Sequence, residues 1–267
     1  MSQILYQFSG KEFAPLDWCD PARHTTLVAD SWRLEEGLVV AWEKHWDRFR
    51  GSVLTNTTVS SLTLDAFRSA LVDILPKAGS WFPRIEAIDT PGGATLRYRQ
   101  REAPPWNSEV VVAIAPHDPR RFPLTKGPDL EALMALRREV EPLGATEAII
   151  VDDAGLLAEG AYSSLMVWPS GSDIPHVISP TTPHLPGVTE SVLKDIATEQ
   201  GIDIKESSLS VTDLEGAELW ILSALHGIRM ATSFIDGPTL SVNTARRDQW
   251  QHLWRQRAVP ISQTPNG

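Results

Sequence analysis

Cysteine is almost absent from this chain of 267 residues, because Cys19 is the only one. A single cysteine excludes an intramolecular disulfide and argues against a thiol-ligated metal site. Positive charge is also scarce: the net charge is −10, which argues against a nucleic-acid partner or an anionic membrane surface. The chain has no run of eighteen apolar residues and no apolar leader, so we expect a cytoplasmic protein without membrane spans.

The rest of the composition is that of an ordinary globular protein. Hydrophobic residues make up 42% and charged residues 22%, and a chain of this length buries a substantial core in one or two domains. We expect most of the ten tryptophans in that core or at a subunit interface. Histidine, aspartate and glutamate show no metal-ligand spacing, so we predict no metal site.

One proline-rich segment divides the chain. Three prolines between residues 116 and 123 exclude regular structure there, so we predict an interdomain linker at 117–125. Hydrophobic periodicity predicts strands and helices on both sides of it, including a hairpin within 26–40 and a helix from Leu64 with Thr63 as its N-cap. It also predicts a helical turn or two at 43–49, a strand at 218–223 and a last helix at roughly 244–257. The sequence therefore predicts a mixed α/β fold with a smaller N-terminal domain at 1–116 and a larger domain at 126–267.

The most informative stretch runs from residue 125 to residue 165. Lys126 lies on a turn before a predicted helix, and an apolar strand at 148–152 follows that helix. Glu159 ends the next strand, 33 residues after the lysine (159 − 126). This arrangement resembles the catalytic segment of the class IV aminotransferases, which are pyridoxal-phosphate enzymes of fold type IV.

The resemblance implies roles for both residues. Lys126 would form a Schiff base with pyridoxal phosphate and move a proton, and Glu159 would keep the cofactor's pyridine nitrogen protonated. Residues 159–166 are similar to the family's Glu-Gly-x-x-x-Asn-Leu-Phe pattern, with Ser164 in place of asparagine. Glu131 stands where many members have a tyrosine, which argues against a branched-chain-type enzyme more than against the family.

Two further motifs match the family's phosphate-binding elements. Residues 45–49 resemble its His-x-x-Arg-Leu motif, and a guanidinium such as that of Arg48 can hold two phosphate oxygens. Residues 185–189 open a predicted helix, whose free N–H groups attract an anion. The resemblance implies that the cofactor contacts Leu185, Gly187, Val188 and Thr189, with the leucine supporting the ring.

A third motif follows an apolar strand. Residues 223–225 resemble the Asn-Ala-Leu loop of the family's aminodeoxychorismate lyases, with serine in place of asparagine. Backbone N–H groups of such a turn suit an anion. We therefore expect Ser223 and Ala224 to contact the phosphate, and we take Leu225 and His226 as candidates for substrate binding.

Alternating arginines supply a second set of substrate candidates. Arg97, Arg99 and Arg101 share one face if the segment is a strand, where they either meet a substrate carboxylate or form a solvated surface. The resemblance points to this segment for the substrate arginine, so we select Arg99 and Arg101.

Taken over residues 28–237, the resemblance implies a fold-type IV enzyme with pyridoxal phosphate between its two domains and a homodimeric assembly. We expect a transaminase acting on a small amino acid or amino-carboxylate. Aminodeoxychorismate lyase, which eliminates pyruvate to give 4-aminobenzoate, is the first alternative. A non-catalytic relative that binds the cofactor or a partner is the second.

Overall fold

The computed structural model describes residues 3–16, 24–179 and 181–261, so Cys19 lies outside the described residues. The chain divides into two compact units. Unit 1 consists of Met1–Pro105, Thr125–Pro128 and Arg257–Gly267, and unit 2 consists of Trp106–Leu124 and Asp129–Gln256. In the described part of the chain, no helix is long and apolar enough to cross a membrane.

Unit 1 is built on an antiparallel five-stranded sheet with the order β2-β1-β8-β7-β3. These strands are β1 (Gln3–Phe8), β2 (Phe13–Pro15), β3 (Thr26–Ser31), β7 (Arg84–Thr90) and β8 (Gly93–Arg101). A small sheet has the order β17-β5-β4-β6. Its members are β4 (Leu34–Glu35), β5 (Leu38–Val40), β6 (Ser80–Trp81) and β17 (Ala258–Pro260).

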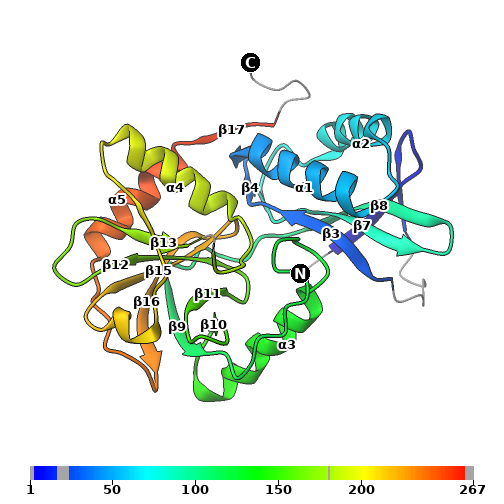
Figure 1. Cartoon of the computed structure of the whole chain (residues 1–267). Coiled ribbons are helices and arrows are strands. Elements are labelled where there is room, and N and C mark those ends of the chain that lie inside the picture. Colours follow the sequence, from blue (N-terminus) through cyan, green and yellow to red (C-terminus); the bar gives the residue numbers. More distant parts are fainter. Residues whose placement is uncertain (1–2, 17–23, 180, 262–267) are drawn as a thin grey trace. The chain divides into compact units, whose positions relative to one another are not determined.

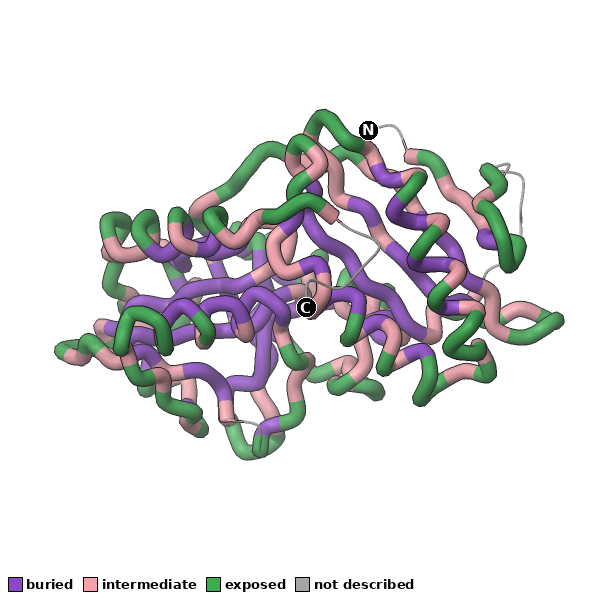
Figure 2. Tube along the Cα trace, turned by 90° about the horizontal axis from the view of Figure 1, so that it is seen from above, coloured by how far each residue is buried: buried purple, intermediate pink, exposed green. Residues whose placement is uncertain are grey.

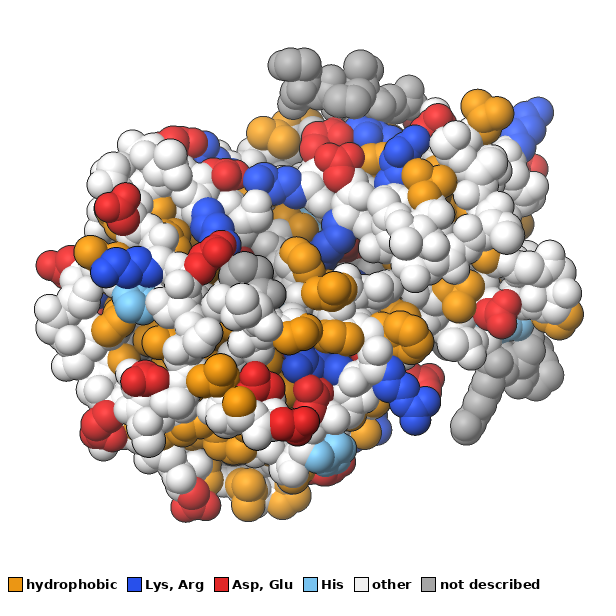
Figure 3. All heavy atoms as spheres, viewed as in Figure 1, with side chains coloured by type: hydrophobic (Ala, Val, Ile, Leu, Met, Phe, Trp, Pro, Cys, Tyr) orange, Lys and Arg blue, Asp and Glu red, His pale blue; other side chains and the backbone are white. Residues whose placement is uncertain are grey.

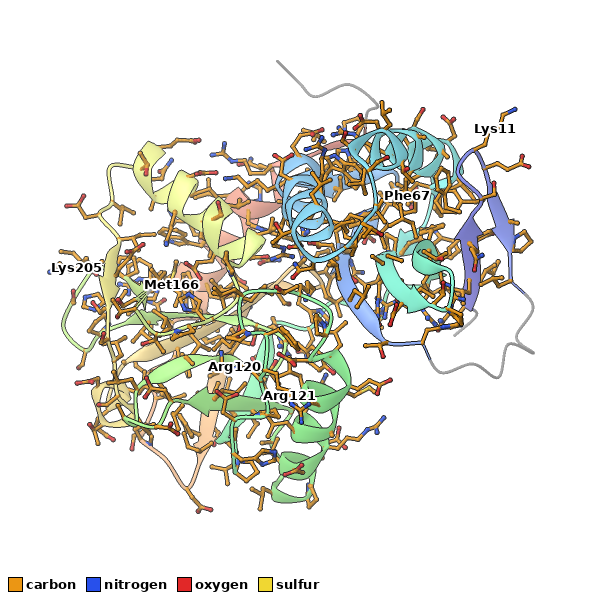
Figure 4. All side chains as sticks on the ribbon, turned by 45° about the vertical axis from the view of Figure 1, so that its right-hand side comes forward. Lys11, Phe67, Arg120, Arg121, Met166 and Lys205 are labelled. Atoms are coloured by element: carbon orange, nitrogen blue, oxygen red, sulfur yellow. The ribbon has the colours of Figure 1, made fainter. Side chains whose placement is uncertain are left out.

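Helices α1 (Trp42–Asn56) and α2 (Ser61–Ile74) pack on one face of the five-stranded sheet (Figure 1). Phe49 and Phe67 of these helices join Ile85 and Tyr98 of the sheet in one buried cluster. Figure 4 labels Phe67. The expected N-cap Thr63 is wrong, because the hydroxyl of Ser60 accepts the N–H of Thr63 and α2 begins three residues earlier than predicted.

Unit 2 is built on a mixed eight-stranded sheet with the order β11-β10-β9-β16-β15-β12-β13-β14. The strands are β9 (Glu109–Ile114), β10 (Glu147–Val151), β11 (Leu157–Gly160), β12 (Ser164–Trp168), β13 (His176–Ile178), β14 (Lys205–Ser207), β15 (Glu218–Ser223) and β16 (Gly227–Ile235). Helix α3 (Leu130–Val140) packs against β10, and α4 (Val188–Glu199) and α5 (Thr244–Arg255) pack against β12, β15 and β16. Two 3-10 turns, η1 (Glu141–Leu143) and η2 (Val211–Leu214), complete the unit.

The division of the chain differs from the expected boundaries at 116 and 126. Strand β9 was expected in the N-terminal domain, but it lies between β10 and β16 in unit 2 and pairs parallel with both. Conversely, Thr125–Pro128 and the last residues of the chain group with unit 1. Parallel pairing joins residues far apart in sequence, so a local linker signal did not reveal it. The segment 116–123 has no regular structure, as predicted.

The hairpin expected within 26–40 is also shorter than predicted. Its turn joins β4 to β5 in the small sheet, whereas β3 pairs with β7 in the five-stranded sheet.

Burial follows the strands of both units, and the exposed residues gather on turns and outer helix faces (Figure 2). Acidic, basic and hydrophobic side chains are interspersed over the face shown in Figure 3. Most described tryptophans are buried, as expected.

Candidate active site

Lys126 is fixed by its backbone to the free edge of β3. The N–H of Ala29 donates a 2.7 Å hydrogen bond to the carbonyl oxygen of Lys126. Gly127 follows with a φ of +137°, and a Cβ there would lie 2.8 Å from Val28. Only glycine permits both this φ and this close approach. The half-buried lysine therefore has its position set by strand β3 rather than by the helix that follows it.

Arg48 is held by a buried carboxylate on the same strand. Its Nε donates to Asp30 Oδ2 at 2.8 Å, and its Nη2 donates to Oδ1 at 3.0 Å. His45, one helical turn earlier on α1, lies 2.8 Å from Oδ1 through its Nδ1. The side chain of Asp30 is 0% exposed and that of Arg48 is 16% exposed. Asp30 thus orients both the histidine and the arginine of the predicted His-x-x-Arg motif.

The charges of this cluster are coupled. Burial acts to raise the pKa of Asp30, but the charges and hydrogen bonds of Arg48 and His45 hold that pKa far below its usual value. Burial lowers the pKa of His45, and the positive charges of Arg48 and Lys126 add to that effect against the opposing charge of Asp30. His45 is therefore neutral at pH 7, and its Nδ1–H donates to the ionised Asp30.

Glu159 lies at the end of β11 in unit 2 and is 7% exposed. Its Oε1 accepts a 2.7 Å hydrogen bond from Nη1 of Arg120, and its Oε2 accepts the N–H of Leu185 at 3.2 Å. Figure 4 labels Arg120, which also bonds Asp118 and the carbonyl oxygen of Pro183. Burial raises the pKa of Glu159, and the ion pair with Arg120 opposes that shift without cancelling it.

The bond from Leu185 to Glu159 brings together two of the predicted cofactor contacts. Helix α4 begins directly afterwards, with Gly187 as its N-cap and no side-chain hydrogen bond to the cap. Val188 and Thr189 form the first buried turn. A helix start of this kind offers backbone N–H groups to an anion.

Ser164 packs against Gly187 at this helix start. Its hydroxyl occupies the space that a Cβ on Gly187 would need. Ser164 is buried and pairs in register with Leu222, the residue before Ser223. Glycine at 187 and serine at 164 therefore fit one another, and the loss of the family's asparagine leaves the helix start intact.

The turn between β15 and β16 contains the remaining predicted contacts of unit 2. Ser223 pairs with Gly227, and the hydroxyl of Ser223 accepts the N–H of His226 at 3.3 Å. Ser223, Ala224, Leu225 and His226 are all half-buried. Nδ1 of His226 accepts the N–H of Asn107, so this imidazole also has a structural role.

Arg97, Arg99 and Arg101 share one face of β8, as their alternation predicted. Glu86 on the neighbouring strand pairs with Arg99 at 3.2 Å and with Arg84 at 2.8 Å. Unit 1 therefore contains Lys126, Arg48 and the arginine strand, whereas unit 2 contains Glu159, the α4 start and the Ser223 turn.

Asp30 and Arg120 were missed from the sequence. Asp30 interrupts the apolar side of a strand, and a charged residue at a core-facing position signals a buried partner. Arg120 lies within the predicted linker, and an arginine in a proline-rich loop gives no sign in the sequence of a buried partner.

A family model described as amino-transferase class IV matches residues 27–234. The chain belongs to the class IV aminotransferase family. The match covers Arg48, Lys126, Glu159 and the α4 start in a single alignment. Among curated proteins, no sequence is significantly similar to this chain.

Solved structures show the same fold. A fold IV transaminase from Curtobacterium pusillum is 19% identical, with a TM-score of 0.77 over 95% of this chain and 99% of that one. A hypothetical aminotransferase from Mycobacterium tuberculosis, in a form bound to pyridoxal phosphate, is 18% identical with a TM-score of 0.77, covering 96% and 98%. The branched-chain amino acid aminotransferase of Escherichia coli is 17% identical with a TM-score of 0.75, covering 100% and 97%. The predicted mixed α/β, fold-type IV architecture is thereby confirmed.

Class IV aminotransferases use pyridoxal phosphate, and the residues of this chain fit that cofactor. In unit 1, Lys126 carries a primary amine that suits an aldehyde, and the guanidinium of Arg48 suits a phosphate. In unit 2, the start of α4, without a side-chain cap, also suits a phosphate. Glu159 suits a pyridine N–H, because a carboxylate has about four acceptor positions and its hydrogen bonds from Arg120 and Leu185 leave room for another.

Proposed function

We propose that the chain is a pyridoxal-phosphate-dependent transaminase for a small amino acid or amino-carboxylate, with Lys126 as the residue that attaches the cofactor. The observation that carries this proposal is the fixed position of Lys126, whose backbone bonds to β3, the strand on which Asp30 orients Arg48. A surface lysine would need neither a following glycine at positive φ, packed against the backbone of β3, nor the hydrogen bond from Ala29.

Each residue has a separate task in this proposal. Pyridoxal phosphate, when bound, withdraws electrons from the α-carbon of an amino substrate. Lys126 provides the attaching amine and then takes the α-proton. Glu159 holds a proton on the pyridine nitrogen, and Arg120 keeps that carboxyl ionised and oriented.

Phosphate binding draws on several groups. We assign it to Arg48, to the N–H groups and hydroxyl at Gly187, Val188 and Thr189, and to the turn at Ser223 and Ala224. Leu185 would support the pyridine ring of the cofactor, because its backbone N–H donates a hydrogen bond to Glu159, the residue assigned to that ring's nitrogen. Leu225, His226, Arg99 and Arg101 are the proposed substrate contacts. The proposed assembly is a homodimer, which light scattering on the purified protein would test.

A lyase is the second candidate, and one observation favours it. The turn after Ser223 continues with Ala224 and Leu225, which resembles the loop of the aminodeoxychorismate lyases. Both reactions begin with removal of the α-proton and differ in whether an amino group is transferred or a leaving group is lost.

Borohydride reduction tests the attachment residue. The protein purified with pyridoxal phosphate should be yellow, and borohydride should abolish the colour and leave the cofactor covalently on the peptide that contains Lys126. Lys126→Ala should lose this labelling, whereas Lys77→Ala, which alters an exposed lysine of the same unit, should retain it. Colour that persists unchanged in Lys126→Ala would refute the assignment.

Product analysis separates the two reactions. Incubation with amino acids of either hand and a keto acid should produce a new amino acid if the chain is a transaminase. Aminodeoxychorismate should give pyruvate and 4-aminobenzoate if it is a lyase. Release of these two products without any amino transfer would overturn the transaminase proposal in favour of the lyase.

A further inference from the structure

A buried ion pair in unit 2 has no role in the function proposed above. Nη2 of Arg229 on β16 donates to Oε2 of Glu147 on β10 at 2.9 Å, and the two side chains are 9% and 1% exposed. Glu147 is in register with Val112 and Arg229 with Ile221, and both of these partners belong to a hydrophobic core of the unit. A buried ion pair adds little stability compared with apolar side chains of similar volume. Stability alone therefore does not explain this pair.

The pair lies at the edge of the eight-stranded sheet where the proposed cofactor groups of unit 2 gather, and we call it the site edge. Strands β9, β10, β12 and β16 start at this edge, whereas β11 and β15 run in the opposite direction and end there. Glu159 is at the end of β11, Ser164 starts β12, and the turn at Ser223 joins β15 to β16. Glu147 is the first residue of β10 and Arg229 the third of β16, so both belong to the site edge.

Glu147 packs against the turn that directly follows β11. A Cβ on Gly160 would lie 3.4 Å from Cγ and Cδ of Glu147, and it would collide with the hydroxyl of Ser163. The N–H of Gly160 donates to the carbonyl oxygen of Ser163 at 2.8 Å, and the N–H of Ser163 donates back at 3.3 Å. The N–H of Ala161 donates to the carbonyl oxygen of Ala148, the neighbour of Glu147, at 2.9 Å. The backbone that sets the end of β11 therefore rests on the start of β10.

Arg229 is anchored close to the turn at Ser223. Ser223 pairs with Gly227, two residues before the arginine. Ile228, directly before Arg229, donates its N–H to Oε1 of Gln251 on α5 at 2.8 Å. Strand β15 and helix α5 thus hold the backbone that carries the guanidinium, and the ion pair connects that backbone to β10.

We propose that the Glu147–Arg229 pair is a positioning device for the cofactor site of unit 2. It fixes Glu159, at the end of β11, relative to the turn at Ser223, so that both can contact one cofactor. Strand β9 separates β10 from β16, so these two strands do not pair with one another. A charge-assisted hydrogen bond has a defined direction and spans that separation, whereas apolar contacts are non-directional. This inference rests on the proposed function, because it assigns residues that position the groups proposed to bind pyridoxal phosphate.

Hydrogen exchange on the apoprotein tests the positioning without the cofactor. Glu147→Gln removes the charge and keeps the size of the side chain. The N–H of Gly160, and the N–H of Leu185 that donates to Glu159, should exchange at least about tenfold faster in this variant. Arg229→Met should have the same effect, and Arg229→Lys, which keeps a positive charge for the carboxylate, a smaller one.

Glu218→Gln is the matched control. The side chain of Glu218 is 8% exposed and accepts a 2.9 Å bond from Arg246, but it starts β15 and so lies at the opposite edge of the same sheet. This variant also loses a buried paired charge, so urea denaturation should show that it is destabilised. Exchange at Gly160 and Leu185 should nevertheless stay at the wild-type rate.

Absorbance titration with pyridoxal phosphate connects the positioning to binding. The affinity should fall about tenfold in Glu147→Gln and stay at the wild-type level in Glu218→Gln. Wild-type exchange at Gly160 and Leu185 in Glu147→Gln, equal acceleration in Glu218→Gln, or equal effects of the Met and Lys variants of Arg229 would overturn the proposal. Unchanged cofactor affinity despite faster exchange would overturn it as well.

Borohydride labelling of Lys126 in the wild type tests the proposed function separately. If the wild type is not labelled, the proposed function fails, whereas exchange on the apoprotein still decides whether the ion pair positions Glu159. If the wild type is labelled and the exchange rates of Glu147→Gln are those of the wild type, the proposed function stands and the positioning role is refuted.

Discussion

Replacement of Asp30 by asparagine removes the charge that orients Arg48 while preserving the size of the side chain. Asp30 makes two bonds to Arg48 and one to His45 inside the core of unit 1. Breaking a buried ion pair by removing one partner costs about 3–5 kcal/mol. Arg48 retains some contact with water, so we expect a loss near the lower value, about 3 kcal/mol, in the free energy of unfolding.

The same substitution should also weaken phosphate binding. Without Asp30 the guanidinium of Arg48 loses its fixed orientation, and we expect pyridoxal phosphate to bind about tenfold more weakly, or about 1.4 kcal/mol. Pyridoxal, which lacks the phosphate, should bind the variant and the wild type alike. Urea denaturation of the apoprotein gives the first quantity, and absorbance titration with the two vitamers gives the second.

Glu43→Gln provides the control for this prediction. Glu43 lies on α1, as Arg48 does, and its side chain is 35% exposed. The substitution removes the charge that pairs with Arg68 on α2. We expect a loss of about 1 kcal/mol or less and an unchanged preference for pyridoxal phosphate over pyridoxal. If Asp30→Asn weakens the binding of pyridoxal as much as that of its phosphate, Asp30 supports the unit in general and does not orient Arg48 toward phosphate.

Three further outcomes are expected. Glu159→Gln should retain the bound cofactor but lower turnover about 10²-fold or more, and turnover near that of the wild type would contradict its role. Gly127→Ala should cost more than about 2 kcal/mol in a urea titration because its Cβ meets the backbone of β3, whereas Gly144→Ala, also at positive φ but in open space, should cost less. Stability should fall as the pH drops below about 6.5 and again below about 4. The pKa values of His45 and Asp30 are both lowered in the folded state, so each contributes stability that is present above its unfolded pKa and lost on acidification. A urea midpoint that is constant from pH 8 to pH 4 would contradict this assignment.

Local signals in the sequence predicted much of the fold. The strand at 218–223 has the predicted bounds, and α5 starts at Thr244 as expected. The strand is an apolar run, whereas the helix is mostly polar and has its buried tryptophans, Trp250 and Trp254, one helical turn apart. The alternation of Arg97, Arg99 and Arg101 predicted a shared face because side chains of a strand alternate strictly.

Long-range relations escaped the sequence. Nothing near residue 126 indicates that its backbone bonds to Ala29, since 97 residues separate the two (126 − 29). The role of Asp30 depends on partners 15 and 18 residues away, on a helix that was predicted as only a turn or two. Motif order could identify Lys126 and Glu159, but the residues that orient Arg48 and Glu159 required their three-dimensional neighbours.

Strand β17 gives unit 1 an unusual dependence on the order of synthesis. Val259 pairs with Val39, so the small sheet of unit 1 is completed only by a strand that is synthesised 220 residues later (259 − 39). At roughly 5–20 residues per second, the ribosome needs about 10–45 s to cover that interval. The nascent unit must keep the edge of β5 unpaired for this time, even though most of its residues emerged first. Removal of β17 would therefore expose the edge of β5 and destabilise the N-terminal unit.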